Sequence, residues 1–122
     1  MGAWGSLPWD NDAAADWYGN LFDETKLATY VEEALKMAAD DGHEEIRAAA
    51  AIVLLFCHNY VWPIDDIDRH LEMAVARLEE LSGMDEYQED ADALAKIQAE
   101  IGVLKARIQS PQEFAHPQWW HY

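Results

Sequence analysis

Residues 44–60 read EEIRAAAAIVLLFCHNY, and this stretch decides the fold. After Arg47, apolar residues fill almost every position as far as Cys57, so the helix that they predict has no polar face. A helix that is apolar all round lies in the interior of a protein. The apolar run is too short to cross a bilayer core of about 30 Å. We therefore expect a buried central helix from about Glu44 to Tyr60.

Apolar residues spaced three and four apart predict further helices on both sides of the central one. The expected ranges are 12–22, 27 to about 41, 65–82 and 85–109, with Gly42 and Gly83 as helix ends. No stretch shows the alternation of a strand. Short connections favour antiparallel neighbours. The sequence thus predicts an all-α fold, a compact antiparallel bundle of about five helices, and a single domain spanning residues 1–122.

Aromatic residues gather near both ends of the chain and around Trp62. We expect the N-terminal aromatic loop (1–9) and the C-terminal aromatic tail (110–122) to meet the Trp62 turn, because this buries ring surface that would otherwise face water. The termini would then form an aromatic cap on the bundle. Trp17 and Tyr30 lie on apolar helix stripes and are also expected to be buried.

The charge of the chain restricts its partners. It carries 24 acidic against 8 basic residues, a formal net charge of −16, and no Lys or Arg occurs between Glu79 and Asp92. A field of this sign repels phosphate backbones and anionic lipid headgroups, and it speeds the encounter with basic proteins. We therefore expect no nucleic-acid and no membrane partner, and favour a basic protein.

Cellular location is predicted from two observations. Cys57 is the only cysteine, so no internal disulfide can form and a reducing compartment is the simpler expectation. Residues 1–5, MGAWG, lack the basic and apolar regions of a secretion signal. The sequence therefore predicts a cytoplasmic protein.

A binding rim is the functional interpretation of the segment before the first helix. Its members combine indole rings with carboxylate and amide oxygens that accept a cation or a basic side chain: Trp4, Trp9, Asp10, Asn11, Asp12 and Asp16. The structural alternative is that the tryptophans anchor a turn while Asn11 or Asp10 caps the helix. Both interpretations stay open at the level of sequence.

The same segment carries a family resemblance. Residues 1–5 (MGAWG), 8–14 (PWDNDAA) and 16–17 (DW) resemble the N-terminal signature of the bacterial domain-of-unknown-function 4259 family, M-G-x-W-G, P-[FW]-x-N-D and A-x-D-[WF]. Leu7 departs from it, because glycine is commoner there in the family. The later Trp62-Pro63 pair, the helix expected after it and the acidic opening of the helix 85–109 are also similar to the family in order and length. The resemblance implies a soluble helical bacterial domain and brings no established activity.

Few residues suggest chemistry. Asp66 and His70 lie four apart on an expected helix and are weak candidates for metal ligands, but they do not repeat the Glu-x-x-His pairs of a di-metal bundle. Cys57 and His58 are adjacent, so on a helix they point about 100 degrees apart, and Cys57 is expected in the core. We predict no metal site and no cofactor.

Three functions remain open. The favoured one is a protein-binding module that engages a basic protein, either as an immunity- or antitoxin-like neutraliser or as a nucleic-acid mimic. The alternative is a metal-dependent or carboxylate/His enzyme, which we rank below a binding role. The third is a self-associating structural module, in which the long helix 85–109 supplies the seam of a homodimer.

Overall fold

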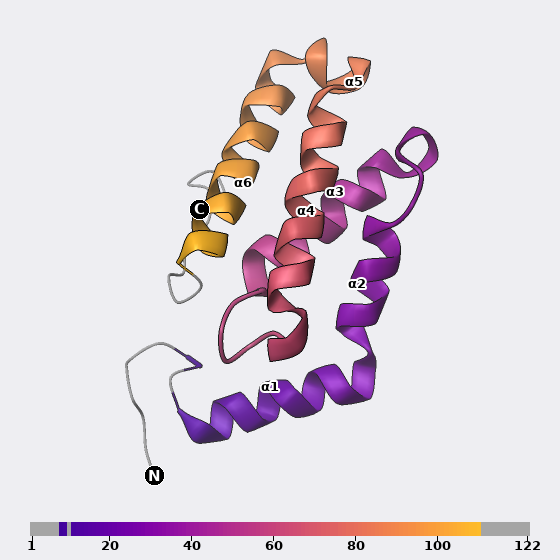
Figure 1. The fold of residues 1–122 in the computed structure, drawn as a ribbon. Coiled ribbons are helices and arrows are strands. Elements are labelled where there is room, and N and C mark those ends of the chain that lie inside the picture. The colour runs from indigo at the N-terminus through magenta and orange to yellow at the C-terminus, as the bar shows by residue number, and fades with distance from the viewer. Residues whose placement is uncertain (1–7, 10, 111–122) are drawn as a thin grey trace.

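The computed structural model describes residues 8, 9 and 11–110, and in this part of the chain the all-α prediction is confirmed. The elements are α1 (Asp12–Thr25), α2 (Leu27–Leu35), α3 (Ala39–Phe56), the 3-10 helix η1 (Ile64–Asp66), α4 (Ile67–Ser82), α5 (Asp85–Gln88) and α6 (Ala91–Gln109). Figure 1 shows α2, α3, α4 and α6 running alternately up and down, with α1 across one end of the bundle.

The core forms where the apolar stripes of these helices face one another. Ile46, Val53 and Leu54 of α3 are fully buried, as are Leu71 of α4 and Leu104 of α6. One face of α3 is therefore buried as expected, but Ala48 and Phe56 are exposed, so the helix is not enclosed on all sides. The helix expected to supply a dimer seam, 85–109, has Ile97, Ile101 and Leu104 on its apolar stripe, and these three are buried within the chain, where α6 packs along α4.

The expected boundary at Gly42 is wrong. Helix α2 ends at Leu35, and α3 already begins at Ala39 and is kinked at Gly42, whose φ of −130° and ψ of 24° are neither helical nor left-handed. The Gly42 N–H bonds the carbonyl of Ala38 at 2.9 Å, and a Cβ at Gly42 would come within 2.7 Å of the Met37 side chain. Gly42 therefore marks a kink within α3 beside the Met37 side chain, and not the end of the preceding helix.

The end of the central helix also differs from the prediction of residue 60. Helix α3 ends at Phe56, and Tyr60 takes a left-handed φ of 74° in the turn that follows. In a longer helix the Leu54 carbonyl would accept the N–H of His58. It accepts instead from the guanidinium of Arg107, at 2.6 Å. A side chain from α6 thus replaces the next helical hydrogen bond.

The helix predicted over residues 85–109 is two helices. The short α5 ends at Gln88, and Asp90 is the N-cap of α6, where its side chain accepts the N–H of Ala93 at 3.1 Å. A carboxylate before an apolar stripe is a helix-start signal. The prediction missed it because the stripe continues across the break through Tyr87.

The aromatic residues are placed less uniformly than predicted. Trp17 is 61% exposed and Tyr30 is 75% exposed, so the expectation that they are buried is wrong. Phe22 does reach the Trp62 turn, with ring centroids 5.0 Å apart in an edge-to-face contact. Helix α1 crosses the end of the bundle, so only one of its faces can be covered (Figure 1). Most of the expected cap, residues 1–7 of the N-terminal loop and 111–122 of the C-terminal tail, lies outside the described residues.

Candidate functional site

The segment proposed as a binding rim is partly occupied by structural contacts. The Asn11 side chain caps α1 by accepting the N–H of Ala14 at 2.8 Å. Trp9 packs against His58 with ring centroids 4.4 Å apart. Asp12 and Asp16 are exposed on α1. The remaining rim residues, Trp4 and Asp10, lie outside the described part of the chain.

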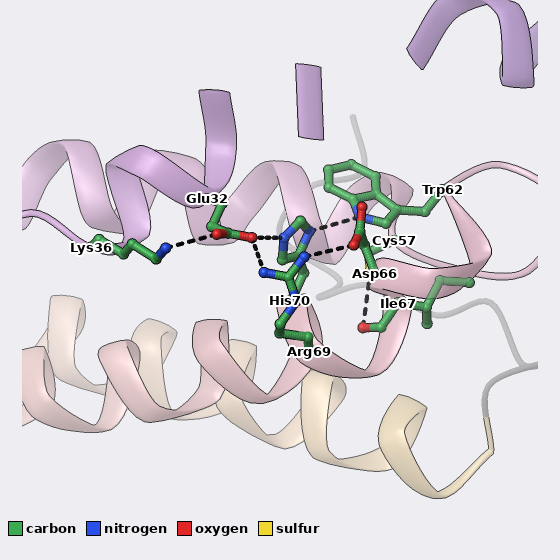
Figure 2. A network of polar contacts seen from close by, with 8 residues as sticks. All are labelled: Glu32, Lys36, Cys57, Trp62, Asp66, Ile67, Arg69 and His70. Atoms are coloured by element: carbon green, nitrogen blue, oxygen red, sulfur yellow. Dashed lines mark hydrogen bonds and ion pairs between the residues drawn. The ribbon is translucent and has the colours of Figure 1, made fainter. Parts of the chain in front are cut away.

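A buried chain of polar contacts joins α2, α4 and the turn after α3 (Figure 2). The indole N–H of Trp62 donates to Nδ1 of His70 at 3.0 Å, and His70 Nε2 lies 2.7 Å from a carboxylate oxygen of Glu32. Trp62 and His70 are 3% and 1% exposed. Because Nδ1 accepts a hydrogen bond, the proton of the neutral ring is on Nε2 and is donated to Glu32.

This geometry determines what His70 can do chemically. A general base needs a free nitrogen lone pair within reach of a substrate. The single lone pair of the neutral imidazole is held by the Trp62 N–H, and its proton is held by Glu32. If His70 carried a second proton, its Nδ1–H would face the indole N–H of Trp62, and two donors would oppose each other. The arrangement therefore suits a structural connection between helices better than proton transfer.

The proposed metal candidates, Asp66 and His70, do not form a site together. The Asp66 carboxylate accepts from Arg69 at 2.6 Å, while His70 faces Glu32 and Trp62. Among residues 8, 9 and 11–110, no group of three or more His, Cys, Asp or Glu side chains is arranged to hold a metal ion. Sequence reasoning missed Glu32, because its position 38 residues before His70 gives no local signal.

Glu32 is the carboxylate on which the side chains of Lys36, Arg69 and His70 converge. Its hydrogen bond with Lys36 and then that with His70 lower the pKa of Glu32 to about 2, and Arg69 adds to the effect. A carboxyl group with a lowered pKa in the folded state stabilises the fold above its unfolded pKa. This contribution falls away as the pH drops from about 4.5 towards 2. The contact is therefore intact at neutral pH.

His58 gives a testable dependence of stability on pH. Burial, followed by the charge of Arg107, lowers the pKa of His58 to about 4 from 6.5. Below pH 6.5 the unfolded chain binds a proton that the folded chain rejects, so His58 destabilises the fold progressively until the pH reaches about 4. Between about pH 7 and pH 5 we expect His58 to cost about 2 kcal/mol. Urea unfolding of the wild type and of His58→Gln at both pH values measures the difference.

His58→Gln is the internal control, because protonation of the many carboxylates affects the stability of the wild type and of the variant equally. We expect the free energy of unfolding of His58→Gln to vary less with pH over this range than that of the wild type. Parallel pH profiles would contradict the buried neutral state of His58.

A polar hollow of about 510 Å³ lies between α3, α5 and α6. Arg47 donates to both carboxylate oxygens of Glu100, at 3.2 and 2.8 Å, and its guanidinium lies 5.8 Å from the centre of the Tyr87 ring. Nδ1 of His43 and the Tyr87 hydroxyl lie 3.4 Å apart. These polar groups contact one another through hydrogen bonds and the Arg47–Glu100 ion pair. We therefore interpret the contacts in this hollow as structural.

An apolar groove lies between α2 and α3 and has a volume of about 540 Å³. The α2 side and the residues just after it supply Leu27, Tyr30, Val31, Ala34 and Met37. The α3 side supplies Ala48, Ala49 and Ile52. Two carboxylates, Glu33 and Glu45, also line it. An open apolar groove of this kind is typical of a binding surface.

The comparisons with known proteins come down to one match. The family model described as Domain of unknown function (DUF4259) matches residues 2–111. The chain belongs to this family. No curated protein and no solved structure matches the chain. Family membership therefore confirms the resemblance seen in the N-terminal motif.

The described helices bear on the expectation that the chain has no membrane partner. Within the described ranges, no helix of this DUF4259 member combines the length and the apolar character that crossing a membrane requires. The apolar residues of α3 pack into the bundle core on one face of the helix and line the groove on another.

Proposed function

We propose that the chain is a protein-binding module that engages a basic protein, with the α2–α3 groove as the contact surface. The observation that carries the proposal is the groove itself, whose lining combines apolar side chains with Glu33 and Glu45. Basic side chains with apolar stems suit such a surface, because the stems cover apolar groups while the charged ends meet carboxylates.

Two further features support a basic partner. The formal net charge of −16 attracts a cationic surface over a distance and disfavours a phosphate backbone or an anionic membrane. Tyr30, at the groove, is 75% exposed, and exposed aromatic rings are favoured contact residues at protein interfaces. Asp12 and Asp16 extend the acidic surface onto α1.

A cytoplasmic location forms part of the proposal. Cys57 is the only cysteine of the sequence, and its side chain is fully buried, with its thiol 3.7 Å from the carbonyl oxygen of Ile67. Burial raises the pKa of this thiol. A buried, protonated thiol is inert to oxidation and suits a reducing compartment.

The test uses two matched substitutions. Ala48 on α3 and Ala95 on α6 are both exposed helix residues, but only Ala48 lines the groove. With the immobilised chain as bait in a lysate of the source organism at low salt, we expect an identified basic protein to be captured. Ala48→Arg should reduce its capture about tenfold or more, because like charges across an interface repel, whereas Ala95→Arg should leave it unchanged.

Two results would overturn the proposal. One is the recovery of no basic protein by the wild-type chain at low salt. The other is equal capture by the Ala48→Arg chain, which would place the contact elsewhere. Thermal unfolding of both variants verifies that each is folded, and the exposure of both alanines makes large losses of stability unexpected.

A further inference from the structure

Resting on the proposed function, we infer that the segment bound in the α2–α3 groove is a basic amphipathic α-helix of the partner. Such a helix would place apolar side chains on the floor of the groove and Lys or Arg side chains beside Glu33 and Glu45. The inference follows from three properties of the groove: its lack of backbone partners, its helical spacing and its charge.

The groove cannot satisfy the backbone of an extended peptide. Both of its walls belong to α-helices, whose own N–H and C=O groups are paired along each helix. An extended segment would bury its peptide groups against apolar side chains without hydrogen-bond partners, which is costly. A helix satisfies its own backbone and needs only side-chain contacts. The chemistry of the walls therefore selects a helical occupant.

The spacing of the lining residues matches helix packing. Leu27, Tyr30 or Val31, and Ala34 follow one another at three- and four-residue intervals, as do Glu45, Ala48 or Ala49, and Ile52 on α3. Rows of this spacing form the ridges between which the side chains of another helix fit. At 1.5 Å per residue, the lining on α2 from Leu27 to Ala34 extends about 10 Å, or about two turns of a bound helix, and Met37 continues it beyond the end of α2. The alanines allow its axis to approach closely.

Charge distinguishes a foreign helix from a second copy of this chain. Two chains with a formal net charge of −16 each repel one another at low salt, and Glu33 and Glu45 would add to this repulsion at the contact. A cationic helix, in contrast, is attracted both by the net charge of the chain and by Glu33 and Glu45. The occupant with complementary charge is therefore a basic helix from another protein.

The experiment measures binding of the full chain to three synthetic peptides of about 14 residues, long enough to span the groove. The first is an amphipathic helix of Leu and Lys. The second has the same composition with two central prolines that prevent the helix. The third carries Glu in place of each Lys. Fluorescence anisotropy gives the affinity, and amide chemical-shift changes locate the contact.

We expect the basic helix to bind at least about tenfold more tightly than either control peptide, and to bind more weakly as salt is raised. Amides around Ala34 and Ala48 should shift. Ala48→Arg should weaken binding about tenfold or more, while Ala95→Arg changes it less than about twofold. The double variant Glu33→Gln/Glu45→Gln should weaken binding a few fold and flatten its salt dependence.

Each contrary outcome has a separate meaning. Equal binding of the proline peptide, still abolished by Ala48→Arg, would overturn the helical occupant and leave the proposed function standing. Preference for the acidic peptide, or no loss of binding with Ala48→Arg, would overturn both. A dimer in light scattering that Ala48→Arg dissociates would make a second copy the occupant and also overturn the inference.

Discussion

Replacing His70 with leucine should lower the free energy of unfolding by about 3 kcal/mol, or the melting temperature by about 10 °C. Trp62 is 3% exposed, and its indole N–H has its acceptor in Nδ1 of His70. Leucine fills much of the space but accepts no hydrogen bond, so a buried donor loses its partner. Thermal and urea unfolding followed by circular dichroism measure the loss.

A double-mutant cycle tests this explanation. When Trp62→Phe is combined with His70→Leu, both partners are apolar, and we expect the pair to cost about 1.5 kcal/mol less than the sum of the single changes. Arg69→Met is the control, because Arg69 binds the same Glu32 carboxylate from an exposed position. It should change stability by less than about 0.5 kcal/mol. Additive losses at Trp62 and His70 would refute the buried contact.

The second large effect is expected at Arg107. This side chain is 2% exposed and donates to the Leu54 carbonyl at 2.6 Å, with the carbonyls of Val53 and Cys57 each at 3.4 Å. A cation at the C-terminus of a helix also interacts favourably with its dipole. Arg107→Met keeps a long apolar stem and removes these donors. We expect a loss of about 3 kcal/mol in urea unfolding, because the Leu54 carbonyl loses its short hydrogen bond from Arg107, while the Val53 carbonyl keeps that from the Cys57 N–H.

Lys105 supplies the matched control on the same helix. Its ammonium group pairs with Glu79 at 2.9 Å, but both side chains are about half exposed. Lys105→Met should therefore change the free energy of unfolding by less than about 0.5 kcal/mol. If the two substitutions cost the same, the role assigned to Arg107 as the C-terminal partner of α3 is wrong.

The sequence predicts well those parts of the fold that depend on apolar periodicity. The buried face of α3 follows from its apolar composition, and the stripe of Ile97, Ile101 and Leu104 follows from spacing, since a helix has a fixed repeat. The end of α3 does not, because a side chain 53 residues later decides it. A signal was present: Arg107 falls on the buried stripe of α6, where a charged residue needs a partner.

The candidate site was harder to predict for the same reason. The acidic charge that favours a basic partner is a property of composition and is visible in the sequence. The groove depends on how α2 and α3 pack, and the exposure of Tyr30 contradicts its place on an apolar stripe. Residues that line a binding surface and residues that fill a core share one periodicity, so spacing alone does not separate them.

The buried position of Cys57 allows transient opening of the fold to be measured through the reactivity of its thiol. It is the sole thiol, it lies where α3 ends, and it is fully enclosed. An alkylating reagent reaches this sulfur only while the surrounding helices separate. The labelling rate in native buffer therefore measures how often the helices open at this end of the bundle, without any engineered probe.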